Sequence, residues 1–214
     1  MIIKKIQDGI HNVLENWNCM RLEEIVKSGN YKNLKRKDEL RIRTFMLDNL
    51  VLEKNVNTIY ISENKKIVIP YHAWEMARRA GYTKLKTVLE NRVRTKTFIA
   101  LFAMCNICNH VEVSSLWRPG QGSTHNTGNG IDIIKIGNHV SARSKTIAIN
   151  PGYEKLKNRI WETGLFSQWI GPWKIRGDRL ATNWISNSAR YQGDKRAPLI
   201  HRTHVDHIHL SVKV

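Results

Sequence analysis

The spacing of apolar residues changes along the chain, and this change constrains the fold more than any other sequence feature. Apolar residues recur with a helical period through the first 60 residues and again over residues 72–109, with a break at Gly81. Between these stretches, residues 58–70 contain two short β-rich runs around residues 63–65, which predicts a hairpin. After Asn109 the pattern becomes short strand-like runs separated by glycine-rich loops. The expected strands are residues 111–117, 131–136, 146–149 and 205–214, and the expected helices include residues 6–14, 37–54 and 153–163.

This order of patterns predicts an α+β fold, in which a small antiparallel sheet flanked by helices follows a mostly helical N-terminal extension. A length of 214 residues allows one domain with an extension. We place the boundary between residues 65 and 66. Residues 1–65 then form the extension, interpreted as a docking or loading segment, and residues 66–214 form the domain that carries the chemistry.

Composition excludes several classes of protein. Apolar residues make up 41% and charged residues 25% of the chain, which is ordinary for a globular protein and excludes collagenous and disordered classes. No apolar run approaches the ~20 residues that span a bilayer, so we expect no membrane span. Residues 1–9 lack the apolar core of a signal peptide, so we expect synthesis in the cytoplasm without an export signal.

The three cysteines cannot form a disulfide framework. Cys105 and Cys108 form a CxxC pair, but they lie in an apolar helical stretch and no second pair accompanies them. A closed zinc site of that type needs four ligands. We therefore expect these two residues to be buried structural thiols rather than metal ligands.

The chain carries a net charge of +17 at pH 7, and the excess is spread along its whole length. Residues 1–100 contain 20 basic and 11 acidic side chains, and residues 101–214 contain 15 and 7. A field of this sign attracts polyanions such as nucleic acid, anionic lipid or a bacterial wall that bears carboxylates or teichoic acids. Charge alone does not choose among these partners.

Histidine and aspartate gather in two segments of the second half of the chain. Four of the nine histidines lie in residues 201–209, and a fifth, His125, lies in a glycine-rich segment that ends at Asp132. Gly128 and Gly130 permit a sharp turn between His125 and Asp132, which would bring the imidazole back to the carboxylate. Two imidazole nitrogens and one carboxylate oxygen, with a fourth position left to water, make a catalytic zinc site.

The second histidine of such a site is expected on the strand at residues 205–214. Side chains alternate between the two faces of a strand. His207 and His209 would therefore share one face, and Asp206 would point to the other.

These two segments resemble the motif of the LAS group of zinc peptidases, in which SxHxxGxAxD is followed by HxH or ExxH. That group includes lysostaphin-type endopeptidases, D-Ala-D-Ala peptidases and the penicillin-insensitive murein endopeptidase, and the hedgehog signalling domain shares its fold. Residues 114–119, SSLWRP, are similar to the Gly-Tyr-Arg-Pro segment of the D-Ala-D-Ala peptidases. The resemblance covers residues 70–214, and Gly130 departs from it by standing where alanine is usual. The matching motif residues are Ser123, His125, Gly128, Asp132, His207 and His209.

The resemblance implies that His125, Asp132 and His209 bind Zn²⁺. It also implies a general base, and two residues compete for that role. In the HxH branch the first histidine is the base, which here is His207. In the ExxH branch a glutamate three residues before the last ligand is the base, and Asp206 holds that position here. We favour His207, because a regular strand points Asp206 away from the last ligand.

Two further side chains receive a role by the same resemblance. Arg118 would hold a substrate carboxylate or the developing oxyanion. The alternative for Arg118 is an ordinary surface arginine in a basic protein. His204 either orients the water or a substrate carboxylate, or is a plain surface residue.

The implied function is a zinc-dependent peptidoglycan peptidase, either an endopeptidase or a D,D-carboxypeptidase, which cleaves a stem-peptide or cross-link amide bond through a metal-activated water. Two alternatives stay open: a basic metal-dependent nuclease or nucleic-acid-binding protein, and a catalytically silent hedgehog-like zinc module. The chain has no helix-turn-helix, zinc-finger or RRM signature, so we expect no stable nucleic-acid partner.

The expected partner is bacterial peptidoglycan, reached at the cell wall or in the periplasm. A wall hydrolase without a signal peptide would be delivered by lysis, as endolysins are, or by a machine, as antibacterial effectors are. A secretion or injection apparatus and an immunity protein are the further partners that the second route implies.

Overall fold

The computed structural model describes residues 19–120, 123–140, 151–177, 181–187 and 198–214, so the expected helix at residues 6–14 and the expected strand at residues 146–149 lie outside it. Helices and strands alternate through the described residues. The helical elements are α2 (Cys19–Ser28), η1 (Tyr31–Asn33), α3 (Arg36–Asp48), η2 (Tyr71–Trp74), α4 (Glu75–Arg79), α5 (Leu85–Arg92), α6 (Thr95–Cys108), α7 (Pro151–Glu162) and α8 (Leu199–Arg202). The strands are β1 (Leu50–Leu52), β2 (Val56–Ser62), β3 (Lys65–Pro70), β4 (His110–Ser115), β5 (Gly130–Ile136), β6 (His139–Val140), β7 (Phe166–Ile170), β8 (Lys174–Gly177), β9 (Ala181–Ser186) and β10 (Ile208–Val212).

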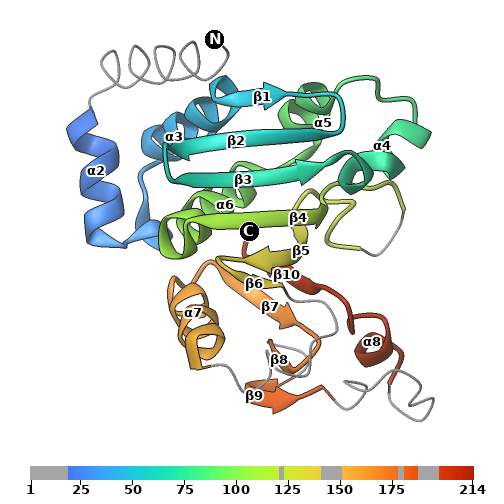
Figure 1. Cartoon of the computed structure of the whole chain (residues 1–214). Coiled ribbons are helices and arrows are strands. Elements are labelled where there is room, and N and C mark those ends of the chain that lie inside the picture. The colour runs from blue at the N-terminus through green and yellow to red at the C-terminus, as the bar shows by residue number, and fades with distance from the viewer. Residues whose placement is uncertain (1–18, 121–122, 141–150, 178–180, 188–197) are drawn as a thin grey trace.

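The ten described strands form a single sheet. Nine of them follow the order β1-β2-β3-β4-β5-β10-β7-β8-β9, and β6 pairs with β5 beside this path (Figure 1). β3 and β4 are parallel, and the other paired strands are antiparallel. β10 follows all the other described strands in the chain, yet it lies near the middle of the sheet, between β5 and β7.

The predicted α+β class is confirmed, but two details of the prediction are wrong. The sheet is large and mixed rather than small and antiparallel. The mostly helical N-terminal extension is also wrong, because β1 and β2 lie at residues 50–62 and join the sheet. Residues 50–52 continue the apolar pattern of α3, and a short apolar run fits a helix or a strand equally well until a neighbouring strand pairs with it. The division of the chain between residues 65 and 66 stays a prediction.

Other local predictions agree with the structure more closely. β2 and β3 form the predicted hairpin, in which Ser62 pairs with Lys65. The strand expected at residues 131–136 is β5, and the helix expected at residues 153–163 is α7. The last strand is shorter than predicted, since β10 begins only at Ile208.

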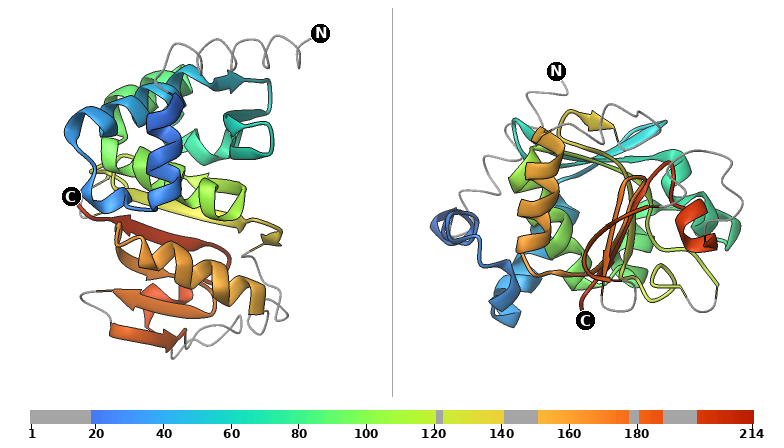
Figure 2. Two further views of the ribbon diagram at one scale, coloured as in Figure 1. Left: turned by 90° about the vertical axis from the view of Figure 1, so that its left-hand side faces the viewer. Right: turned by 90° about the horizontal axis from the view of Figure 1, so that it is seen from below.

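α6 is the central helix of the core. Ten of its 14 residues are buried, which is expected for a helix that is apolar on all sides. α6 contacts β2, β3, β4, β5 and β10 on one side and α3 on another, and α7 packs beside it. Figures 1 and 2 show α3, α5 and α6 on one face of the strands β1 to β4. The sheet residues that are fully buried include Ile59, Ile67, Val111, Ile131, Ile133, Ile208 and Leu210.

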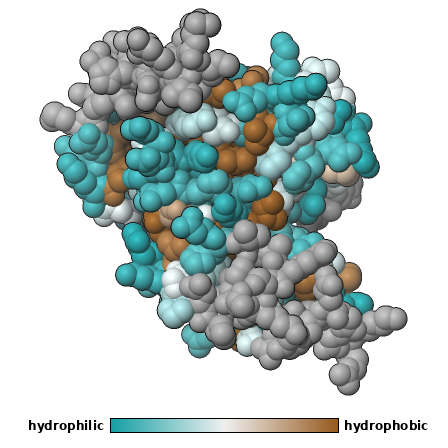
Figure 3. Space-filling model, viewed as in Figure 1, coloured by the Kyte–Doolittle hydropathy of each residue, from teal (hydrophilic) through white to brown (hydrophobic). Residues whose placement is uncertain are grey.

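Along β5 and β10, apolar side chains of the core alternate with polar side chains on the opposite face of the sheet. Ile131 and Ile133 of β5 pair with Leu210 and Ile208 of β10, and all four are fully buried. Asp132 lies between the two isoleucines, so its side chain points to the face of the sheet away from α6. Seen from that face, the surface over β1 to β4 is mostly hydrophilic with hydrophobic patches between (Figure 3).

Among the described residues, no helix has the length and apolar character needed to cross a membrane.

Candidate metal centre

A tightly folded loop carries His125 to the sheet. The loop connects β4 to β5, and its backbone bonds close on themselves: Asn129 and Gly130 both donate their N–H to the carbonyl of Thr124, each at 2.9 Å. The backbone N–H of His125 donates to Ser123 Oγ at 3.2 Å. These bonds turn the chain back, so that His125 lies beside Asp132 of β5.

Two glycines make this path possible. Gly128 has φ +76°, and a Cβ at this position would collide with the backbone carbonyl oxygen of Arg92. A Cβ at Gly130 would lie 2.7 Å from the backbone nitrogen of His125 and 2.8 Å from Thr124 Oγ1. In this loop, glycine rather than alanine therefore fits position 130, which is where the sequence departs from the LAS motif.

Three buried side chains converge from the loop, β5 and β10. Asp132 Oδ1 lies 3.0 Å from His125 Nε2 and 2.7 Å from His209 Nδ1, and the two nitrogens are 3.1 Å apart. His209 is the register partner of Asp132 across the β5–β10 pair. His125 is fully buried, and Asp132 and His209 are nearly so. The group could hold a metal ion.

Hydrogen bonds behind the two histidines decide which ring nitrogen faces the centre. His125 Nδ1 lies 2.6 Å from the carbonyl oxygen of Leu116, which only accepts, so Nδ1 carries the proton and Nε2 has a lone pair. Ser211 Oγ donates to Gln168 Oε1 at 2.9 Å. In the tautomer in which Ser211 Oγ accepts from the Nε2–H of His209 at 3.2 Å, the lone pair of Nδ1 faces Asp132 and His125.

These residues fit a metal ion on chemical grounds. Two imidazole lone pairs and a carboxylate oxygen point at one another, and such an arrangement repels itself unless a cation or protons lie between them. Tetrahedral ligands about 2.1 Å from a zinc ion lie about 3.4 Å from one another. The observed separations of 2.7–3.1 Å are shorter than that value by a few tenths of an ångström to about 0.7 Å.

The charge state of the cluster also suits a cation. Burial by itself would raise the pKa of Asp132, but when protons rather than a cation lie between the three side chains, hydrogen bonds from His125 and His209 outweigh burial and hold that pKa below its ordinary value. Burial lowers the pKa of His209. The folded chain thus favours a charged carboxylate beside a neutral imidazole, which is the protonation state that metal ligands need.

His207 and Asp206 form a pair at the edge of the cluster. Both precede β10, so the strand alternation used to place them does not apply to them directly. His207 Nε2 nevertheless lies 3.8 Å from Asp132 Oδ1, on the side of the cluster. His207 Nδ1 lies 2.7 Å from Asp206 Oδ1, and because a carboxylate only accepts, Nδ1 carries the proton. The lone pair of Nε2 is thereby left on the side of the cluster.

Arg118 reaches the cluster from the segment after β4. Its Nη2 lies 3.7 Å from Asp132 Oδ2, whereas His125 and His209 contact the other carboxylate oxygen, Oδ1. The side chain is 41% exposed, so the guanidinium borders both the buried carboxylate and solvent. Such a position is open to a second anion.

His204 packs against His207 and His209 rather than lying free on the surface. Its ring centroid is 5.0 Å from that of His207 and 5.4 Å from that of His209. Nδ1 lies 2.6 Å from the carbonyl oxygen of Ile200, so Nδ1 is the donor there and Nε2 has the lone pair. Burial lowers the pKa of His204 to about 4, which keeps this ring neutral at pH 7.

Sequence reasoning missed part of the environment of the cluster. Thr124, with its Oγ1 3.2 Å from His209 Nε2, and Gln168, which accepts from Ser211, were not singled out. Thr124 lies beside a motif histidine, so its position carried a signal. Gln168 lies on β7, remote in sequence, and only the strand pairing reveals it.

Cys105 and Cys108 are buried free thiols, as predicted. Burial raises the pKa of both, in the case of Cys108 to about 11, which opposes the thiolate form that binds metals. Their sulfurs lie near backbone carbonyl oxygens at the end of α6. They take no part in the His–Asp cluster.

Comparisons with known proteins do not assign the chain to a family. No protein-family model matches the chain, and comparisons with curated proteins and with solved structures found no match. The site itself is therefore the basis for functional interpretation.

Proposed function

We propose that this protein is a zinc-dependent peptidase that hydrolyses an amide bond in the stem peptides or cross-links of bacterial peptidoglycan. The observation that carries the proposal is the buried His125–Asp132–His209 group with a third imidazole beside it, that of His207, whose outer nitrogen is held by a carboxylate. A structural metal site would close its coordination with a fourth protein ligand, whereas a catalytic site keeps a position open.

The donor set favours zinc among common metals. Two imidazoles and one carboxylate suit Zn²⁺, while Ca²⁺ and Mg²⁺ prefer oxygen ligands throughout. When bound, zinc supplies Lewis-acid chemistry that polarises a scissile carbonyl and acidifies an attacking water.

The residues of the chain then divide the remaining work. His207 accepts the proton of the attacking water on Nε2, whose lone pair faces the cluster, and passes it to the leaving amine. Asp206 holds the ring through Nδ1–H and stabilises the positive charge that His207 carries between the two transfers. His204 offers a neutral acceptor at Nε2 beside His207.

Arg118 is suited to hold a carboxylate of the substrate. Its guanidinium is partly exposed and already borders a carboxylate, that of Asp132. Stem peptides of peptidoglycan carry free carboxylates, and an arginine binds such groups with two parallel hydrogen bonds. Both an endopeptidase and a D,D-carboxypeptidase would use an anchor of this kind.

Digestion of defined muropeptides, followed by mass spectrometry, tests the proposal. The wild-type protein should release a new amine terminus in the presence of zinc, and a chelator should abolish the product. His125→Ala should lose both zinc and activity, whereas His72→Ala, which removes an exposed histidine outside the cluster, should keep both. A protein that binds zinc but leaves muropeptides and intact sacculi unchanged would contradict the peptidase assignment and favour a silent zinc module.

A further inference from the structure

The helical side of the molecule carries a surface that is distinct from the metal centre. It is strongly basic: residues 35–43 and 84–96 contain ten lysines and arginines and three acids. Two of those acids, Asp38 and Glu39, are buried, and Glu90 is the exposed one. We call the cationic part nearest to α6 the basic face, which consists of Lys35, Arg36, Arg43, Arg92, Arg94 and Lys96.

Contacts between α3, α5 and α6 join these residues into one surface. Buried Glu39 binds Arg36 at 3.3 Å from one side and Lys96 from the other, which brings the start of α3 to the start of α6. Arg43 of α3 donates to the backbone carbonyl of Glu90 on α5. The two runs of cations are therefore neighbours in space although about 50 residues separate them in the sequence.

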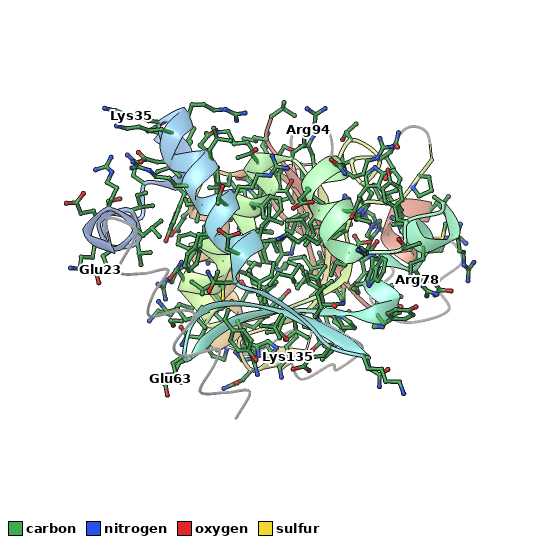
Figure 4. All side chains as sticks on the ribbon, turned by 90° about the horizontal axis from the view of Figure 1, so that it is seen from above. Glu23, Lys35, Glu63, Arg78, Arg94 and Lys135 are labelled. Carbon is green, nitrogen blue, oxygen red and sulfur yellow. The ribbon has the colours of Figure 1, made fainter. Side chains whose placement is uncertain are left out.

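The basic face continues to the loop that carries His125. Arg94 Nε donates to the carbonyl of Thr127 at 3.1 Å, and the guanidinium of Arg92 lies 5.1 Å from the ring centroid of Trp117, the residue before Arg118. Figure 4 shows Lys35 and Arg94 pointing outward on the helical side, whereas Lys135 and Glu63 lie on the opposite side. Asp132 also faces away from the helices, so a ligand on the basic face leaves the metal centre open.

We infer that the basic face binds a linear anionic polymer of the bacterial wall, one with repeated phosphate groups such as poly(glycerol phosphate). Like charges gathered at this density repel one another in the folded chain, and a polyanion removes that repulsion and releases its own counterions. The choice of a wall polymer rests on the proposed function. A binder of single-stranded nucleic acid would offer exposed aromatic rings for stacking, and none of the strongly exposed aromatic residues in the described part of the chain lies on α3, α5 or α6.

The test is co-sedimentation of the full-length protein with walls that carry glycerol phosphate polymer and with the same walls after acid removal of that polymer. The variant Lys35→Glu/Arg92→Glu changes the basic face. Its matched control, Lys66→Glu/Lys135→Glu, makes the same change in net charge on the other face, because Lys66 and Lys135 point away from α6 through the β3–β4–β5 register. Melting curves check that both variants fold.

We expect the wild-type and control proteins to bind polymer-bearing walls alike, with affinity that falls steeply as salt rises. The basic-face variant should bind these walls roughly 25-fold more weakly, at about fivefold for each of the two substituted residues. Equal weakening in both variants would overturn the inference, because net charge alone would then explain binding. Displacement of the walls by stoichiometric DNA would also overturn it and assign the face to nucleic acid. The assay measures no hydrolysis, so failure of the peptidase proposal would be seen separately.

Discussion

The Asp206–His207 pair offers the sharpest test of how the proposed centre works. Asp206 Oδ1 lies 2.7 Å from His207 Nδ1, and the Asp206 side chain is 49% exposed. A hydrogen bond to a charged group contributes about 1.5–3 kcal/mol, and exposure to water reduces this, so we take about 1–2 kcal/mol for the proton-accepting step. Removal of the carboxylate in Asp206→Ala should therefore lower kcat by roughly 5- to 30-fold.

Two further variants separate a positioning role from a catalytic one. His207→Ala removes the proposed base itself and should lower kcat by about 10²–10⁴-fold while zinc stays bound. Asp206→Asn keeps an oxygen that accepts from Nδ1–H, so it should lose less than Asp206→Ala. If Asp206 were the base instead, the asparagine and alanine variants would be equally inactive.

The assay is steady-state hydrolysis of a defined muropeptide, with kcat and KM determined separately and zinc measured by mass spectrometry. The effect should appear in kcat, with KM and zinc content close to wild type, because neither residue binds the metal in our proposal. Wild-type kcat in Asp206→Ala, or full activity in His207→Ala, would refute the reasoning.

Three other predictions concern the metal and the fold. Zinc at 100 times its Kd should stabilise the protein by about 2.7 kcal/mol, so a chelator should lower Tm in differential scanning calorimetry, and an unchanged Tm would argue against a metal bound to the folded state. Gly128→Ala should destabilise by about 1–3 kcal/mol in urea unfolding, more than Gly81→Ala, since both glycines have positive φ but only position 128 meets the backbone of Arg92. The pKa of Cys108 is raised to about 11, so the unfolded thiol ionises at lower pH than the folded one, and the free energy of unfolding should fall as pH rises above about 9. Native Cys108 should also react slowly with thiol reagents at pH 8, and fast labelling would contradict its burial.

The sequence allowed the individual elements and the metal-binding cluster to be predicted better than the sheet that holds them. A helix as apolar as α6 and a hairpin between two adjacent β-rich runs, as in β2–β3, follow from local patterns. The convergence of His125 and Asp132 was predictable because they are only seven positions apart and two glycines lie between them.

The extent of the sheet was not predictable in the same way. β1 is only three residues long, and it becomes a strand because Leu50, Val51 and Leu52 pair with β2. The prediction that His207 lies on a strand was also wrong, although its ring still faces the cluster. Side chains brought by distant strands, such as Gln168 behind Ser211, leave no local signal at all.

The position of β10 has a consequence for biosynthesis. β5 and β7 emerge from the ribosome first, and the slot between them is filled only when β10 follows. Because His209 lies on β10, 77 residues after Asp132, the cluster needs a contact between residues far apart in the chain. A nascent chain would therefore carry an incomplete metal centre until β10 has been synthesised and has entered the sheet. If the protein does cut bacterial walls, the order of its strands keeps a nascent chain that lacks β10 inactive.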